Sequence, residues 1–194
     1  MSFHISTLPD LKDDDVNILL LDLEGVMTKG MLGGAPHLGN LFYYHMQGEC
    51  DGIYSADATR HVETLVNQYN FRIVLITRHG KNEGHILQKR LDNAGIQKDW
   101  LYARDPDAIG EHHKDEGIRG WMDRNPQIPM SRIVCVEDHP ENITVIPPER
   151  VVGTNGDRGM VYRDYKRVLS IMGMVPLRPV SAATRRQGPQ APSA

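Results

Sequence analysis

The sequence predicts an α/β domain with a doubly wound, Rossmann-like and mostly parallel sheet that carries helices on both faces. Short apolar runs at 18–21, 71–76 and 133–136, the second interrupted only by Arg72, are typical of strands buried on both faces. Between these runs, apolar residues recur at the spacing of amphipathic helices. With 194 residues, 40% of them hydrophobic, the chain can bury one substantial core.

The first strand, 18–21, leads into a glycine-rich stretch over 28–54 that also contains Phe42, Tyr43 and Tyr44. We expect a hairpin flap there; its aromatic residues either stack on a substrate ring or pack on the core. Ser55 is placed to cap a helix with apolar residues at helical spacing. These are Ala58, Val62, Leu65 and Val66.

The rest of the chain continues the alternation. The strand over 71–76 precedes a helix over 82–94, which Gly95 ends. The later elements are a short strand over 100–103, a helix over 112–124, a strand over 133–136, a weaker strand over 150–153 and a helix over 161–172. We therefore expect a single domain over 1–178, and a disordered tail over 179–194 because that segment is rich in proline, alanine and serine.

Composition narrows the class of protein. A formal net charge of −3 gives no global electrostatic case for nucleic-acid binding, although it leaves room for a local basic patch. Cys50 and Cys135 are too few for a disulfide framework, so we expect reduced thiols and a cytoplasmic location. No stretch has the apolar length of a signal peptide or a membrane span, which predicts no membrane partner; export by a route that reads no N-terminal signal stays open.

Two acid pairs follow predicted strands. Asp22 and Glu24 come at the end of the first strand, and Glu137 and Asp138 follow the strand over 133–136. Carboxylates are costly beside a buried strand, and the carboxyl ends of parallel strands meet where ligands bind. One carboxylate can act as a nucleophile and another as a general acid and base, and carboxylate oxygens suit Mg²⁺. A single pair is also typical of a solvated strand end, but two such pairs favour a site.

Three further residues are candidates for phosphate binding. Thr77 ends the strand over 71–76, where its hydroxyl can donate to a phosphate oxygen, and Arg78 is adjacent. Lys114 opens the helix that ends at residue 124. Taken singly, each has an ordinary alternative: a threonine at a strand end, an arginine in a solvated loop and a solvated lysine at a helix start.

As an ordered set, these motifs resemble the haloacid dehalogenase (HAD) superfamily of phosphatases and phosphotransferases. The set is Asp22-x-Glu24-Gly25-Val26, Thr77, Lys114 and Glu137-Asp138. The resemblance implies an HAD-like fold over about 17–156, in which Asp22 is the nucleophile and Glu24 the general acid and base. Glu24 departs from the superfamily's usual second aspartate, and its side chain is longer by one methylene. A carboxyl at this position argues against the dehalogenase branch.

The resemblance also implies how a phosphate and a metal are held. Thr77 and Lys114 bind the phosphoryl group, with Arg78 as a further candidate for substrate binding. Asp22, the backbone carbonyl of Glu24 and Asp138 hold Mg²⁺. Glu137 and Asn142 are candidates for supporting that metal site from beside it.

The intervals between motifs predict little or no cap domain, and therefore an open site. We expect a bulky or macromolecular phosphomonoester, either a phosphoprotein (phosphotyrosine) or a nucleic-acid end. The stretch from Lys114 to Trp121 resembles HAD domains of nucleic-acid repair proteins. Small-metabolite or nucleotide phosphatases and a non-enzymatic HAD-scaffold binding module are the alternatives. The order of the motifs disfavours a response-regulator receiver, and the spacing of His112, His113 and His139 disfavours zinc.

Overall fold

The computed structural model describes residues 16–28, 55–80, 100–104 and 113–176. In these residues, five parallel strands form one sheet in the order β3-β2-β1-β4-β5. The strands are β1 (Asn17–Asp22), β2 (Phe71–Gly80), β3 (Trp100–Arg104), β4 (Ile133–Glu137) and β5 (Val151–Gly153). The α-helices are α2 (Ala56–Tyr69), α4 (His113–Arg124) and α5 (Tyr162–Ile171). Three short 3₁₀ helices are η2 (Met130–Arg132), η3 (Pro140–Asn142) and η4 (Pro148–Arg150). The predicted α/β fold is confirmed.

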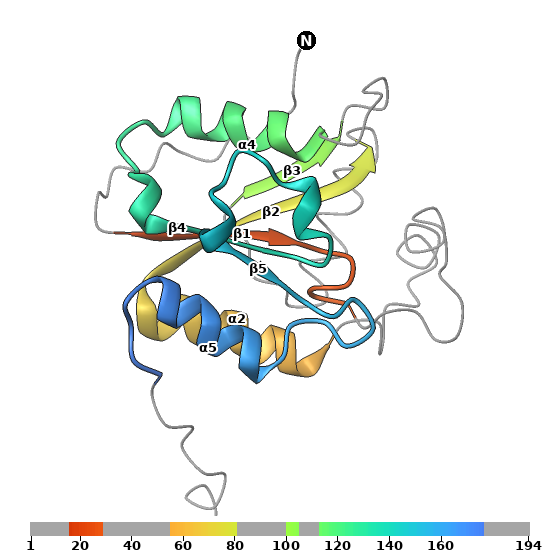
Figure 1. Cartoon of the computed structure of the whole chain (residues 1–194), viewed down its shortest axis with the longest axis vertical. Helices are drawn as coiled ribbons and strands as arrows, with labels where there is room; N and C mark the ends of the chain where they lie inside the picture. The colour runs from red at the N-terminus through yellow and green to blue at the C-terminus, as the bar shows by residue number, and fades with distance from the viewer. Residues whose placement is uncertain (1–15, 29–54, 81–99, 105–112, 177–194) are drawn as a thin grey trace, which may run out of the picture.

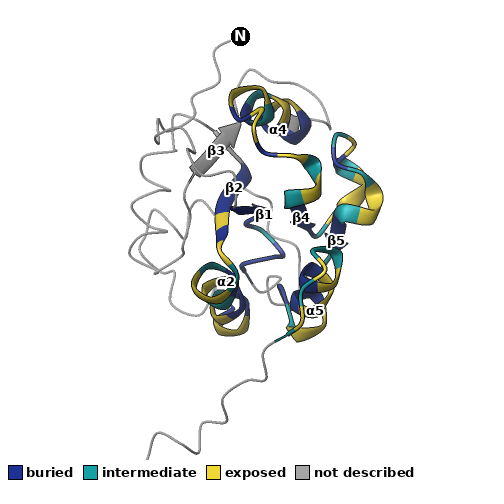
Figure 2. Ribbon diagram, turned by 90° about the vertical axis from the view of Figure 1, so that its left-hand side faces the viewer, coloured by how far each residue is buried: buried dark blue, intermediate teal, exposed yellow. Residues whose placement is uncertain are grey.

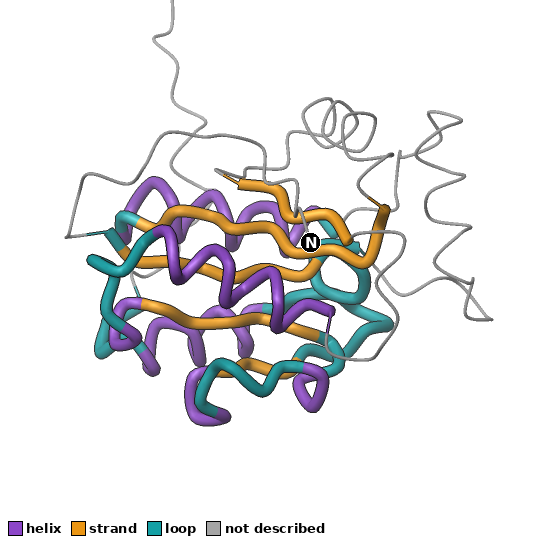
Figure 3. The backbone as a smooth tube through the Cα atoms, turned by 90° about the horizontal axis from the view of Figure 1, so that it is seen from above, coloured by secondary structure: helices purple, strands orange, loops and turns teal. Residues whose placement is uncertain are grey.

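The helices cover both faces of the sheet. α2 and α5 lie against one face and α4 against the other (Figure 1). Because side chains alternate along a strand, β1 contributes Leu19 and Leu21 to the core under α2 and α5, and Ile18 and Leu20 to the core under α4. Buried residues accordingly line the inner sides of the helices (Figure 2). From above, the strands lie side by side with helices in front of and behind them (Figure 3).

Local sequence signals set both ends of α2, of which the Ser55 cap was predicted. The Ser55 hydroxyl accepts a hydrogen bond from the backbone N–H of Ala58 at 3.3 Å. At the other end, Asn70 adopts a left-handed conformation with φ of 54°, and its N–H donates to the Leu65 carbonyl. The chain turns there directly into β2.

The end of β2 differs most from the sequence prediction. β2 extends to Gly80 rather than residue 76, so Thr77 lies within the strand and not after its end. Backbone pairing with β3 continues past the apolar run, with Thr77 opposite Ala103 and a register irregularity before Gly80. The sequence showed where apolar side chains stop, whereas the strand ends where its backbone partners stop.

Several predictions concern parts of the chain outside the described residues. These are the flap beyond Thr28, the aromatic residues 42–44, the helix over 82–94 and the tail over 179–194. Among the helices that are described, none is both long and apolar enough to cross a membrane.

Candidate active site

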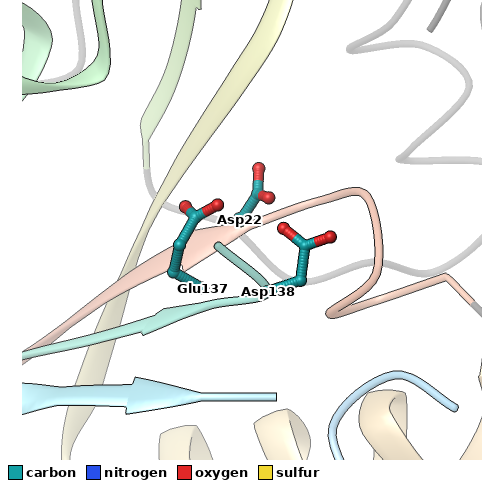
Figure 4. A group of neighbouring side chains, drawn as sticks. All are labelled: Asp22, Glu137 and Asp138. Carbon is teal, nitrogen blue, oxygen red and sulfur yellow. The ribbon is translucent and has the colours of Figure 1, made fainter. Parts of the chain in front are cut away.

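The site lies at the carboxyl edge of the sheet. Asp22 is the last residue of β1, Glu137 is the last of β4, and Asp138 follows it directly. β1 and β4 are neighbours in parallel register, with Leu21 opposite Val136, so the next residues of both strands come together. The three carboxylates gather at this edge, as the sequence predicted for two acid pairs on parallel strands (Figure 4).

Lys114 supplies the positive charge. From the first turn of α4, its ammonium Nζ lies 2.8 Å from Asp22 Oδ1 and 2.9 and 2.8 Å from the two Glu137 oxygens. The side chains of all three residues are almost completely buried. Lys114 therefore joins β1 to β4 and donates to both oxygens of Glu137, an interaction that the sequence analysis did not anticipate.

Burial shifts the ionisation of this cluster. Burial raises the pKa of Asp22 well above its usual value; the Lys114 ammonium works against this rise, and the Glu137 charge adds to it. Burial likewise raises the pKa of Glu137, against the opposing effect of Lys114. Burial alone would lower the pKa of Lys114, but Asp22 and Glu137 outweigh it and raise that pKa. The carboxylates thus outnumber the positive charge that stabilises them.

The donor set fits a hard divalent cation. One carboxylate oxygen from each of Asp22, Glu137 and Asp138 lies within 4.8 Å of the others. Ligands on opposite sides of Mg²⁺ are about 4.2 Å apart, twice its bond length of about 2.1 Å, so the cluster is close to the required size. Both oxygens of Glu137 already accept from Lys114. Asp22 and Asp138 are therefore the better ligands, and Glu137 serves to hold Lys114.

The turn after β1 brings its backbone against Asp138. Gly25 has a φ of 68°, and a Cβ built on it would lie 2.5 Å from Asp138 Oδ2. The position thus requires glycine twice, once for the left-handed backbone and once for the close approach. Glu24 is half-buried in this turn, two residues after Asp22. The contact of its carbonyl with a metal stays a prediction.

Comparison with known proteins identifies the fold family. The sequence matches, over residues 18–165, the family described as the HAD domain in Swiss Army Knife RNA repair proteins. The chain belongs to this family. A similar solved structure is the HAD domain of effector protein Lem4 from Legionella pneumophila, at 17% identity and a TM-score of 0.52. The match covers 81% of this chain and 95% of that one. No curated protein matches the chain.

Within this HAD domain, the remaining predicted residues take different places. Thr77 is fully buried in β2, directly after Ile76, whose backbone lies opposite Asp22. The backbone of Arg78 continues β2, and its side chain lies outside what the structure describes. Asn142 ends η3, where its N–H donates to the His139 carbonyl at 2.9 Å. Its supporting role at the metal site stays a prediction.

The sequence analysis missed the loop after β5. The N–H of Thr154 donates to the Glu137 carbonyl at 3.0 Å, and its hydroxyl donates to the Gly25 carbonyl at 3.1 Å. A Cβ on Gly156 would lie 3.2 Å from Asp138 Oδ2. This loop therefore ties β4 to the turn after β1 and encloses Asp138. The sequence did carry a signal for this loop, since Thr154 and Gly156 follow a fifth strand that ends at the same edge of the sheet.

Proposed function

We propose that this HAD domain is a Mg²⁺-dependent phosphomonoester hydrolase that works through an aspartyl-phosphate formed on Asp22. The observation that carries the proposal is the buried Asp22 carboxylate, held 2.8 Å from the Lys114 ammonium and clustered with Asp138 at the sheet edge. Phosphoryl transfer needs a positioned nucleophile and fixed positive charge around the phosphoryl oxygens. At this edge, β1 contributes the carboxylate of Asp22, and the first turn of α4 contributes the ammonium of Lys114.

In the first step, an Asp22 oxygen attacks phosphorus, and the bond from phosphorus to the leaving oxygen breaks. The protonated Glu24 carboxyl gives its proton to that leaving oxygen. In the second step, Glu24 takes a proton from a water molecule whose oxygen attacks phosphorus. The bond from phosphorus to Asp22 breaks, inorganic phosphate leaves, and both side chains return to their starting states.

The other residues hold the phosphoryl group. Lys114 balances the charge that develops on its oxygens, and the Thr77 hydroxyl donates to one of them. Mg²⁺, held by Asp22 and Asp138, supplies further positive charge when bound. Glu137 keeps the Lys114 ammonium at the nucleophile, because its two oxygens accept from Nζ at 2.8 and 2.9 Å.

We place the phosphorylated end of an RNA strand first among substrates. The family is described from RNA repair proteins, and the stretch over 114–121 resembles HAD domains of nucleic-acid repair proteins. The net charge of −3 offers no general attraction for a polyanion, so recognition must come from local groups near the site. The competing hypotheses are a phosphotyrosyl protein or a small phosphorylated metabolite or nucleotide as substrate, and a binding role without catalysis.

The first test is hydrolysis of an aryl phosphate with and without Mg²⁺ by the wild type, Asp22→Asn and Asp123→Asn. The last variant makes the same chemical change at an exposed position of α4. We expect Asp22→Asn to lower kcat by at least about 10³-fold, because it removes the nucleophile, and Asp123→Asn to keep the wild-type rate. Trapping of phosphate on Asp22 by rapid acid quench and mass spectrometry identifies the intermediate.

A second test compares RNA carrying a 5′- or 3′-terminal phosphate, phosphotyrosyl peptides and mononucleotides as substrates. The proposal predicts the highest kcat/KM for a phosphorylated RNA end. A higher value for the peptides or mononucleotides overturns the assignment of substrate but leaves the chemistry in place. No Mg²⁺-dependent turnover above that of Asp22→Asn on any of them overturns the enzyme and leaves a binding module.

A further inference from the structure

Asp115, the neighbour of Lys114 in the first turn of α4, is a buried carboxylate that the proposed chemistry does not use. It is only 3% exposed. Its Oδ1 accepts from the backbone N–H groups of Thr144 and Val145 at 3.0 and 3.4 Å. Its Oδ2 accepts from the Thr144 N–H at 3.2 Å and from the Thr144 hydroxyl. Three donors thus bind this buried carboxylate, and such charge-assisted hydrogen bonds hold the segment over 144–145 firmly against Asp115.

These contacts join two segments that both carry residues of the site. Thr144 and Val145 follow η3, in the chain that leaves β4 after Glu137 and Asp138. Asp115 lies 29 residues earlier, beside the lysine that pairs with Glu137. The first turn of α4 is therefore attached to β4 at its last residue, through Lys114, and to the loop beyond it, through Asp115.

The two attachments act in different directions. Successive residues of an α-helix project about 100° apart, since about 3.6 residues make a turn. Lys114 reaches the sheet edge, and Asp115 reaches the loop over 144–145. Two neighbouring side chains anchored on different sides fix both the rotation of the helix about its axis and its distance from the sheet. The buried Ile118 and Trp121 pack the body of α4 on the sheet, and the two anchors fix its first turn.

We propose that Asp115 is a positioning residue that holds the Lys114 ammonium against Asp22 and Glu137. The general attraction between a carboxylate and a helix N-terminus does not explain why Asp115 is buried. Glu116 lies in the same turn and provides that attraction while it stays exposed to solvent. The kinetic consequence rests on the proposed function, because Lys114 affects turnover only where phosphoryl transfer occurs. The placement of Lys114 itself does not rest on it.

A direct test measures the placement of Lys114 by brief acetylation with acetic anhydride, followed by mass spectrometry. The exposed Lys166 on α5 is the internal reference. Wild type, Asp115→Asn, Thr144→Val and the control Glu116→Gln are compared while circular dichroism shows them folded. We expect the Lys114-to-Lys166 labelling ratio to rise severalfold in Asp115→Asn, less in Thr144→Val, and not at all in the control. An unchanged ratio in folded Asp115→Asn overturns the proposal; if that variant does not fold, an unchanged ratio in Thr144→Val does so.

The kinetic arm measures kcat for the aryl phosphate in a double-mutant cycle. We expect Asp115→Asn to lower kcat by about 10- to 100-fold, the scale of a catalytic group displaced by about 1 Å. Made in the Lys114→Met protein, the same change should lower the residual kcat no further, because Asp115 acts through Lys114. Equal losses in both backgrounds indicate a general structural role and overturn the proposal. Absence of turnover in the wild type, with the labelling result as expected, counts against the proposed function alone.

Discussion

Replacing Lys114 with methionine tests the electrostatics of the site most directly. Methionine fills a similar volume without charge, so the change leaves Asp22 and Glu137 facing each other without their shared cation. In the structure, the ammonium lies 2.8 Å from Asp22 Oδ1 and 2.8 and 2.9 Å from the Glu137 oxygens, and all three side chains are buried. The pKa values of both carboxyls are raised even with Lys114 present. The variant should therefore fold less stably.

The size of the loss follows from this geometry. Removing one partner of a buried ion pair costs about 3–5 kcal/mol, because a buried charge is left uncompensated. Here two carboxylates lose their partner, and protonation of one of them limits the cost, so we expect the upper part of that range. For a chain of this length, each kcal/mol lowers the midpoint of thermal unfolding by about 2–4 °C. The expected decrease is roughly 10–20 °C.

Urea unfolding at neutral pH, with a chelator to remove divalent cations, measures the free energy of unfolding. Tryptophan fluorescence and far-ultraviolet circular dichroism should report the same transition. Lys166→Met is the matched control: Lys166 is exposed and lies 5.1 Å from the Tyr162 ring centroid, an interaction of at most about 1 kcal/mol. Adding Glu137→Gln to Lys114→Met removes one uncompensated charge and should recover about half of the loss.

Two results would refute this reasoning. A loss below about 1 kcal/mol in Lys114→Met would mean that the ammonium does not compensate buried carboxylates in solution. A double variant less stable than Lys114→Met alone would mean that Glu137 stabilises the fold by some interaction other than its pair with Lys114.

Three further predictions concern the same site and the neighbouring helices. The pKa of Asp22 is raised above its usual 3.8, so the folded state holds that proton more tightly than the unfolded state. Without divalent cations, the contribution of Asp22 to the free energy of unfolding should therefore fall as pH rises from about 4 through the pKa of folded Asp22. Urea titrations across pH measure this contribution as the difference in slope between the wild type and Asp22→Asn. Gly25→Ala should weaken the rise in melting temperature expected on adding Mg²⁺, because the new Cβ displaces Asp138. Gly173→Ala is the control, since Gly173 has a φ of 69° with open space around it. The control should cost similar backbone strain and leave the rise intact. Burial lowers the pKa of His61, so the contribution of His61 to stability should be lost as pH drops below about 6.5. This slope is opposite in sign to that of Asp22, and the difference between the wild type and His61→Phe in the same titrations measures it.

Much of the fold is predictable because the sheet is parallel and buried. Strands covered on both faces are largely apolar, and the runs at 18–21, 71–76 and 133–136 are visible for that reason, with the exposed Arg72 as the exception. The end of β2 was not predictable in the same way. Thr77 is polar, so hydrophobicity places it at the boundary, but its backbone pairs with Ala103 and the strand continues. Pairing between distant segments decides that end, and a single sequence does not show such pairing.

The candidate site was likewise predictable only in part. Asp22, Glu137 and Asp138 were predicted to meet because each follows a strand, and parallel strands end at one edge. The bond between Lys114 and both oxygens of Glu137 spans 23 residues, and the contact of Asp115 with Thr144 spans 29. Neither contact carries a local signature. Lys114 looks like a solvated lysine at a helix start, and Asp115 looks like an ordinary partner of the helix dipole. The loop after β5 was missed because it contributes structural contacts of Thr154 and a close backbone approach at Gly156 rather than a reactive group.

The charges at this edge favour a cation before any substrate arrives. Lys114 pairs with Asp22 and Glu137, and Asp138 lies beside these two, so the cluster holds three carboxylates and one ammonium. A phosphate monoester brings further negative charge at neutral pH, and the burial that already raises the pKa of Asp22 would make its approach costly. A divalent cation held by Asp22 and Asp138 removes that cost, since it offsets two carboxylate charges and leaves Lys114 for the phosphoryl oxygens. The excess of buried carboxylates is thus a reason to expect that metal binding precedes substrate binding at this site.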